Sequence, residues 1–333
     1  MGLAKKKLAT WVMIGSTLPM PMVTMASDAE VKMYPQHPIT LVVGFPPGAA
    51  TDTLARHLAK NMAEELGQRV IVENRPGAAG NVGAAAVAHS LPDGYTIYLA
   101  LSSATLHKQL YRQVHYDFAA DLAPVGLAAS APYVLIMGQH VPARTLADAI
   151  QLARENPGKM TVASGGIGSV GHILSEAIQA AASVRLTHVP YKGAVPALTD
   201  VQGGRADFMI TTLPSVLSHL KAGRVRGMAV LTNDRLAVVP ELPAIAEYGF
   251  KDARGSEWFA VMAPTETPPY AIDRLNRAIN TVLGDAQIRA PLTQLGYVIK
   301  PESNTPEALD ALIDQHTRRW VPLLEEHGIT GVQ

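Results

Sequence analysis

The chain has 333 residues, of which 48% are hydrophobic and 17% charged, with 28 Lys and Arg against 28 Asp and Glu. It is long enough for two domains with cores of their own and too apolar for a disordered chain. Without a basic excess, nucleic acid is not an expected partner, because phosphate backbones are bound by Lys and Arg. The absence of cysteine excludes disulfides, thiolate metal sites and a cysteine nucleophile.

Residues 1–26 are predicted to be an export signal. Three lysines at 5–7 precede a short apolar run at 8–18, and cleavage near Ala26 or Ala29 fits the small-x-small rule. A single-pass membrane anchor is the alternative, but the run is too short to span a bilayer and two prolines follow it. We therefore expect a periplasmic protein, in a compartment where ATP and NAD are scarce.

Beyond the signal, strand-like and helix-like segments alternate. Apolar, β-branched runs predict buried strands, and apolar residues three or four apart predict helices. Up to residue 101 the predicted order is strand, helix, strand, helix, strand, at 39–45, 51–66, 70–73, 81–90 and 95–101. Thr51 or Asp52 is the expected N-cap of the first helix, and Gly67 its C-terminal stop. This order predicts a largely parallel sheet with helices on both faces.

The same alternation restarts later and predicts a second α/β unit. Its strands are expected at 159–164, 186–189, 206–211 and 227–232, and its helices at 172–182 and 194–203. The isolated apolar runs Tyr133–Met137 and Glu257–Met262 are predicted to cross between the two units. The C-terminal helices, at 269–283, 285–295 and 305–326, are expected to return to the first unit.

These segments predict an α/β fold of two lobes joined by two hinge-crossing strands. Residues 34–132 with 259–333 are expected to form the first lobe, and residues 133–258 the second. Ligands of open α/β sheets bind outside the carboxyl ends of the strands, and here two such edges can face each other. We therefore expect a ligand cleft between the lobes.

The loop Phe45–Asp52, between a strand and a helix, has the features of an anion site. The first N–H groups of a helix have no partner within it, and the helix N-terminus carries a partial positive charge. Gly48 and the following alanines let an anion approach the backbone closely. The Asp52 carboxylate would repel an anion, so we expect it to cap its own helix and to pair with Arg56.

A glycine-rich segment, Ser164–His172, matches G-x-G-x-x-G after a strand and before a helix. Dinucleotide binding is not favoured, because the acid expected about 20 residues further on is missing. The remaining interpretation is a turn that presents N–H groups and the hydroxyls of Ser164 and Ser169 to a carboxylate. His172, at the start of the helix, is more consistent with a structural role than with a ligand contact.

Two further kinds of loop follow strands. Tyr191 offers a ring and a hydroxyl, and the adjacent Lys192 is either a carboxylate partner or simply solvated. Hydroxyl residues also follow two other strands, at Ser102, Ser103, Thr211 and Thr212. Such hydroxyl groups suit either binding of an oxygen-rich ligand or plain helix capping.

No catalytic motif accompanies these loops. The chain contains no G-x-S-x-G, no H-E-x-x-H and no clustered metal ligands. This favours recognition without turnover, with no cofactor and no metal. The alternative from another class is a secreted hydrolase that uses a serine of the Ser164–Ser169 segment.

With these loops in place, the chain resembles the extracytoplasmic solute receptors of tripartite tricarboxylate transporters, the Bug or TctC-type family. The resemblance is carried by Tyr34-Pro-x-x-Pro-Ile, the 45–52 loop with Arg56, and the segments 72–81, 93–96, 189–193 and 258–264. It implies a type II periplasmic-binding-protein fold of the Venus-flytrap kind, which closes on a small carboxylate. It also implies inner-membrane permease subunits of a tripartite tricarboxylate transporter as partners. The receptor is expected to be a monomer. The alternative to delivery to a permease is a receptor that signals to a membrane sensor.

The resemblance further implies that backbone groups and ordered water of the 45–52 loop and the glycine-rich segment hold the carboxylate. Family members usually have Gly-Gly where this chain has Gly48-Ala49, and the added methyl group should either narrow the pocket or shift the backbone. The expected ligand-binding residues are Phe45, Pro47, Gly48, Ala49, Ala50, Thr51, Asp52, Ser102, Ser103, Ser164, Gly165, Gly168, Ser169, Val170, His172, Tyr191, Thr211 and Thr212.

Overall fold

The computed structural model describes residues 34–299, 304–326, 328–329 and 331. The predicted export signal at 1–26 lies outside the described residues. Within those ranges no helix combines the length and the apolar character that a bilayer crossing requires.

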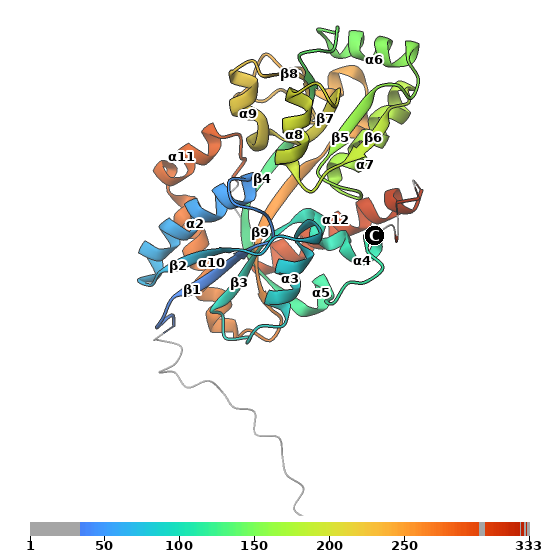
Figure 1. The fold of residues 1–333 in the computed structure, drawn as a ribbon. Helices are drawn as coiled ribbons and strands as arrows, with labels where there is room; N and C mark the ends of the chain where they lie inside the picture. The colour runs from blue at the N-terminus through green and yellow to red at the C-terminus, as the bar shows by residue number, and fades with distance from the viewer. Residues whose placement is uncertain (1–33, 300–303, 327, 330, 332–333) are drawn as a thin grey trace, which may run out of the picture. The chain divides into compact units, whose positions relative to one another are not determined.

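Three parallel strands form the core of the first α/β part (Figure 1). β1 (Ile39–Val43) pairs in parallel with β2 (Val70–Asn74) on one side and with β3 (Thr96–Leu101) on the other. The chain passes between these strands through α2 (Ala50–Leu66) and α3 (Asn81–Ala88). The predicted order of the first five elements is therefore confirmed, with boundaries that differ by one or two residues at most ends.

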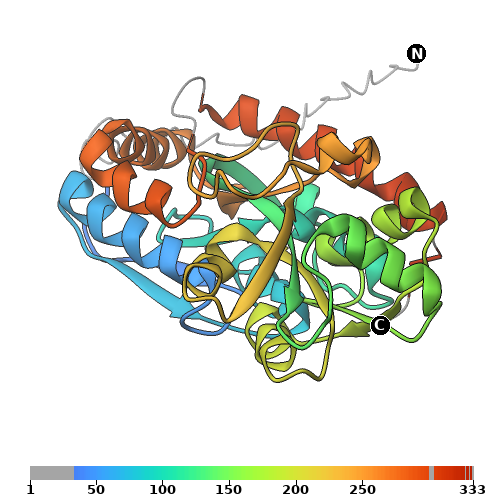
Figure 2. The same ribbon diagram turned by 90° about the horizontal axis from the view of Figure 1, so that it is seen from above.

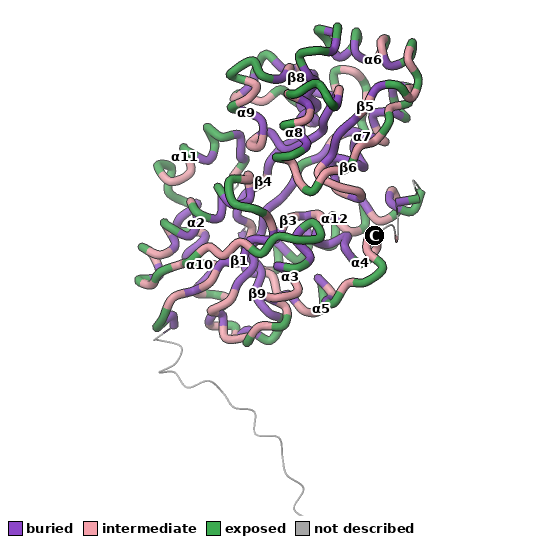
Figure 3. The backbone as a smooth tube through the Cα atoms, in the orientation of Figure 1, coloured by how far each residue is buried: buried purple, intermediate pink, exposed green. Residues whose placement is uncertain are grey.

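Helices cover both faces of this first sheet. Leu41 packs in one cluster with α2 and α10 (Pro269–Gly284), whereas its neighbour Val42 packs in another with α3 and α12 (Pro306–Glu326). Successive strand residues point to opposite faces, so a strand covered on both sides has to be apolar throughout. Figure 3 shows the result, with buried strands inside and exposed residues along the outer surfaces of the helices.

The second α/β part repeats this arrangement. β5 (Thr161–Ser164) pairs in parallel with β6 (Thr187–Pro190) and with β7 (Phe208–Thr212). Within it, α7 (Val170–Ala182) follows β5, and α8 (Ala194–Gln202) follows β6.

Two helices cover each face of the second sheet as well. α6 (Leu146–Glu155) and α7 share one apolar cluster, and α8 shares another with α9 (Leu213–Lys221). Neither α6 nor α9 was expected from the sequence. α9 starts directly after β7 and carries Pro214 in its first turn, a position where the missing N–H of proline costs nothing.

Two long strands connect the parts, and Figure 1 shows both running from one part into the other. β9 (Ser256–Pro264) pairs antiparallel with β3, and β4 (Leu122–Gly138) pairs antiparallel with β9. From Tyr133 onwards, β4 pairs instead with β7 and with β8 (Val225–Val230). The nine strands of the described residues thus join one sheet of order β2-β1-β3-β9-β4-β7-β5-β6, with β8 beside β4.

The two crossing strands confirm the two-lobed α/β fold and correct its details. The predicted 133–137 strand is too short, because β4 begins eleven residues earlier in a stretch rich in Ala, Gly and Pro that shows no strand alternation. The parallel pairing predicted for the first unit is confirmed by β1, β2 and β3, whereas the crossing strands β4 and β9 pair antiparallel, so the sheet as a whole is mixed. The residue boundaries predicted for the lobes stay a prediction.

The start of α2 also differs from the prediction. The helix begins at Ala50 with Ala49 as its N-cap, so neither Thr51 nor Asp52 caps it. Asp52 instead lies within the first turn and accepts the N–H of Gly48 from there. The predicted stop at Gly67 is confirmed, since this residue has a left-handed φ of 69°.

The C-terminal helices divide their contacts. α10 packs on α2, as expected, and α11 (Ala286–Gln294) follows it. The end of α12 departs from the prediction: Leu309 packs in the first part, but Trp320 belongs to a cluster of the second part. In Figure 2, α2 and the green helices of the second part lie at opposite sides of the view.

Short helical turns complete the described fold. They are η1 (Ala78–Gly80), η2 (Ser102–Leu106), α4 (His107–Leu110), α5 (Phe118–Asp121), η3 (Ile245–Tyr248) and η4 (Lys251–Ala253).

A buried histidine on α12 makes stability depend on pH. His316 is 7% exposed, and burial together with the charge of Arg319 lowers its pKa to about 3. The unfolded chain, with an ordinary pKa near 6.5, binds more protons between these values, so this stability is complete above pH 6.5 and is lost as the pH falls. We predict that His316→Gln flattens the decline of unfolding free energy between pH 6.5 and 4.5 by up to about 1.4 kcal/mol per pH unit.

The measurement is urea denaturation across that pH range. Exchange of the exposed His115 for Gln is the control and should leave the slope as it is in the wild type. A His316→Gln slope equal to that of the wild type would contradict the prediction.

Candidate functional site

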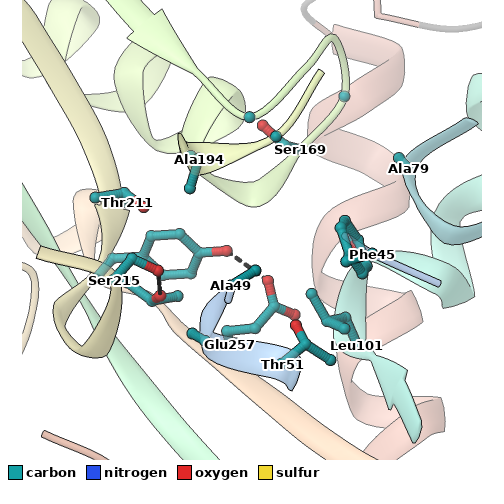
Figure 4. Close-up of a pocket in the computed structure, with 18 of the residues that line it drawn as sticks. Phe45, Ala49, Thr51, Ala79, Leu101, Ser169, Ala194, Thr211, Ser215 and Glu257 are labelled. Atoms are coloured by element: carbon teal, nitrogen blue, oxygen red, sulfur yellow. Dashed lines mark hydrogen bonds between the residues drawn. The ribbon is translucent and has the colours of Figure 1, made fainter. Parts of the chain in front are cut away.

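A cavity of about 120 Å³ lies between the two α/β parts (Figure 4). The first part contributes Phe45 and the residues Ala49–Thr51 at the start of α2. The second part contributes residues at the starts of three helices: Gly168, Ser169, Gly171, Gly193, Ala194, Thr211, Thr212 and Ser215.

The strand directions explain why four helix N-termini meet here. β5, β6 and β7 run parallel, so α7, α8 and α9 all begin at the same edge of the sheet. α2 begins after β1 and reaches the cavity from the other part. Ala49, Ser169, Gly193 and Thr212, the N-caps of the four helices, all line the cavity. Each end carries roughly half a positive charge and N–H groups without partners in the helix.

The side chains around the cavity are mostly apolar or hydroxylated. Thr51, Ser103 and Ser169 bring hydroxyl groups, and Thr212 and Ser215 hydrogen-bond to each other at 2.9 Å. None of the described lining residues is Lys or Arg. An anion placed here would therefore be stabilised by main-chain N–H groups and helix ends instead of a cationic side chain.

Asp52 holds the 45–52 loop in shape. Its carboxylate accepts the Gly48 N–H at 2.9 Å, forms an ion pair with Arg56 at 2.9 Å and accepts the Asn74 amide at 2.9 Å. The same Asn74 amide donates to the Phe45 carbonyl. Burial raises the pKa of Asp52, but these hydrogen bonds outweigh it and lower the pKa below its ordinary value. The expected Asp52–Arg56 pair is confirmed, and Asp52 does not line the cavity.

Close packing shapes the glycine-rich segment. Gly168 has a φ of 72°, and a Cβ there would lie 2.0 Å from Leu110 Cδ2, so only glycine fits. Ser169 caps α7 by accepting the His172 N–H, and its hydroxyl donates to the Gly166 carbonyl at 2.8 Å. His172 Nδ1 accepts the Gly168 N–H at 3.1 Å. These bonds fix the conformation of the segment, in which Gly168 and Ser169 line the cavity.

A serine–histidine pair lies behind this segment. Ser164 Oγ is 2.7 Å from His188 Nε2 and also donates to the Gly166 carbonyl. Ser164 is completely buried and does not line the cavity, and burial lowers the pKa of His188 to about 4. A nucleophile has to touch its substrate, so this geometry holds a loop in place and offers nothing to a ligand in the cavity.

The structure gathers ten of the expected site residues around the cavity: Phe45, Ala49, Ala50, Thr51, Ser103, Gly165, Gly168, Ser169, Thr211 and Thr212. It leaves eight outside the lining: Pro47, Gly48, Asp52, Ser102, Ser164, Val170, His172 and Tyr191. Gly48 borders a neighbouring hollow between α2 and α8, and Tyr191 borders another beside the exposed Lys192.

Sequence reasoning missed several lining residues on the crossing strands. Tyr133 on β4 and Glu257 on β9 meet at the cavity, where the Tyr133 hydroxyl donates to Glu257 Oε2 at 2.6 Å. Phe259 lines it too, because residues 257 and 259 share one face of β9. An acid at the start of an otherwise apolar strand was the signal that could have pointed to Glu257.

The sequence profile described as "Tripartite tricarboxylate transporter family receptor", TctC, matches residues 54–329. The chain belongs to the TctC family. This TctC receptor is 38% identical over 314 residues to a UPF0065 protein encoded in the tcbD-tcbE intergenic region of Pseudomonas sp. strain P51, covering 94% of this chain and 93% of that protein. It is also 36% identical to the protein BugT of Bordetella pertussis, covering 91% of this chain and 93% of BugT.

Solved structures agree with this membership. An R. palustris protein solved with adipate shares 33% identity and superposes with a TM-score of 0.84, covering 89% of this receptor and 99% of that chain. MatC from Rhodopseudomonas palustris, solved with bound malate, shares 30% identity with a TM-score of 0.81, covering 87% of this receptor and all of MatC.

We predict that Asp52→Ala destabilises this TctC receptor by about 1–3 kcal/mol, because the Gly48 N–H and the Asn74 amide lose their acceptor. The pKa of Asp52 is lowered, so its contribution is present above the ordinary carboxyl pKa near 3.8 and is lost as the pH falls. Urea denaturation at pH 7 measures the difference. Asp273→Ala, at an exposed position of α10, is the matched control and should stay within about 0.5 kcal/mol of the wild type. Equal losses in the two variants would refute the assigned role.

Proposed function

We propose that this protein is a periplasmic receptor that binds a small carboxylate in the cavity between its lobes and delivers it, chemically unchanged, to the permease of a tripartite tricarboxylate transporter. The convergence of four helix N-termini on one cavity whose described lining holds no Lys or Arg carries this proposal. The export signal at 1–26 would deliver the chain to the periplasm.

The physical argument rests on charge compensation. A carboxylate loses its hydration when it enters a cavity, and unpaired N–H groups at the starts of α2, α7, α8 and α9 can replace the lost hydrogen bonds. These groups are stronger partners where water is excluded, because the local dielectric constant is low. Since they are held by the backbone, they need little rearrangement when the ligand arrives.

The neighbours support the same ligand class. The two R. palustris proteins were solved with adipate and malate, which are both small dicarboxylates. The ten expected residues that line the cavity are the proposed contacts, with Phe45 and the hydroxyl residues deciding which acid fits. The lobes 34–132 with 259–333 and 133–258 would move about β4 and β9 to enclose it.

A carboxylate that binds only the folded state must raise the melting temperature. We predict a concentration-dependent shift for at least one member of a panel of aliphatic, amino-acid and aromatic carboxylates, worth about 2.7 kcal/mol at a hundred times the Kd. Ala194→Trp, which fills the cavity from the start of α8, should abolish the shift.

Leu91→Trp, at a position 75% exposed, adds the same ring outside the cavity and should keep the full shift. A panel without any shift in the wild type would refute carboxylate binding. A full shift in folded Ala194→Trp would place the ligand elsewhere.

The permease partner is tested in cells. Deletion of the gene should abolish uptake of the radiolabelled ligand identified in the panel, and the wild-type gene, but not the Ala194→Trp variant, should restore it. Undiminished uptake with a lost transcriptional response would indicate a receptor that signals to a membrane sensor.

A further inference from the structure

Glu257 is a buried acid in the wall of the cavity. It is 4% exposed, and Figure 4 shows its carboxyl group turned toward the middle of the labelled residues. No ion pair with Lys, Arg or His is formed by Glu257 within the described part of the chain. A negative charge in the wall of this cavity needs a compensating partner, because burying an unpaired charge costs free energy.

Hydrogen-bond donors surround the carboxyl group of Glu257. The Ser102 hydroxyl donates to Oε1, and the Tyr133 hydroxyl donates to Oε2 at 2.6 Å. The backbone N–H groups of Ser102 and Ser103 also hydrogen-bond to it. An ionised carboxylate can accept all of these bonds, so its surroundings can accommodate the charged form.

Burial acts against this charge. The pKa of Glu257 is raised above its ordinary value, because burial outweighs the opposing bonds from Ser102, Tyr133 and the backbone of Ser103. Donors lower the cost of the buried charge but do not neutralise it, and a cation beside the carboxylate would. Among the described residues no side chain supplies that cation, whereas the carboxyl group borders the space that a ligand fills.

The two sides of the cavity thus differ in electrostatic character. In Figure 4, Ser169 and Ala194, at the starts of α7 and α8, lie across the view from Glu257. The N–H groups on that side match an anion, and the carboxylate on the other side matches a cation. A molecule that carries both a carboxylate and an ammonium group complements both sides.

We propose that Glu257 binds the ammonium group of the ligand and that the receptor therefore selects amino-substituted carboxylates over plain acids of the same carbon skeleton. This rests on the proposed function and narrows its ligand class. Glu257 would act as a specificity-determining residue: it attracts a zwitterion and repels the second carboxylate of a plain diacid.

Matched ligand pairs test the proposal. Isothermal titration at pH 7.5 compares aspartate with succinate, glutamate with glutarate, and γ-aminobutyrate with butyrate. In the pair that binds tightest, we expect the wild type to hold the amino acid at least tenfold more tightly than its partner. Glu257→Gln removes the charge and keeps the shape of the side chain. It should erase this preference, because the affinity for the amino acid falls at least tenfold while the affinity for the plain acid stays the same or rises.

Glu266→Gln, which removes an exposed acid just beyond β9, is the charge-matched control and should keep the wild-type preference. A plain acid that binds the wild type as tightly as its amino partner would overturn the proposal and leave carboxylate binding intact. Failure of every acid in a carboxylate panel to bind would instead refute the proposed function. Should Glu257→Gln not fold, the wild-type ratios alone decide between these outcomes.

Discussion

The structure depends on one constraint, the direction of parallel strands. Because β5, β6 and β7 run the same way, the helices that follow them start at one edge, and β1 brings the start of α2 to the same cavity. An anion site then needs no lysine or arginine, since unpaired N–H groups and aligned peptide dipoles provide the positive potential. The small residues at these starts, such as Ala49 and Gly193, keep the backbone accessible.

The surrounding side chains hold these backbone groups in place. Asp52 ties the 45–52 loop to Arg56 and Asn74, while Ser164 and His172 tie the glycine-rich segment from behind. The crossing strands have a second task besides connecting the lobes, because β4 and β9 bring Tyr133 and Glu257 into the wall of the cavity. Backbone amides would thus recognise what carboxylates have in common, and Glu257 would distinguish among them.

Much of this was predictable where the physics is local. A strand that runs into a small-residue loop and then a helix predicts an N-terminal anion site, and the pairing of Asp52 with Arg56 follows from their spacing on a helix. The length of β4 was not predictable, since its first half owes its conformation to pairing with β9 and not to its own alternation. The N-cap of α2 was misassigned because Asp52 is engaged by Gly48, Arg56 and Asn74 across the loop.

By itself, the sequence determined the α/β class, the two-lobed organisation and the loops around which binding is expected, because periodicity, glycine and helix starts act over a few residues. Only the tertiary structure decided which of those loop residues reach the same cavity and that Glu257 joins them. Glu257 is 155 residues from Ser102 and 124 from Tyr133, and strand pairing alone brings these three together. Contacts over such separations depend on which distant strands pair, and a pattern of a few residues does not specify that.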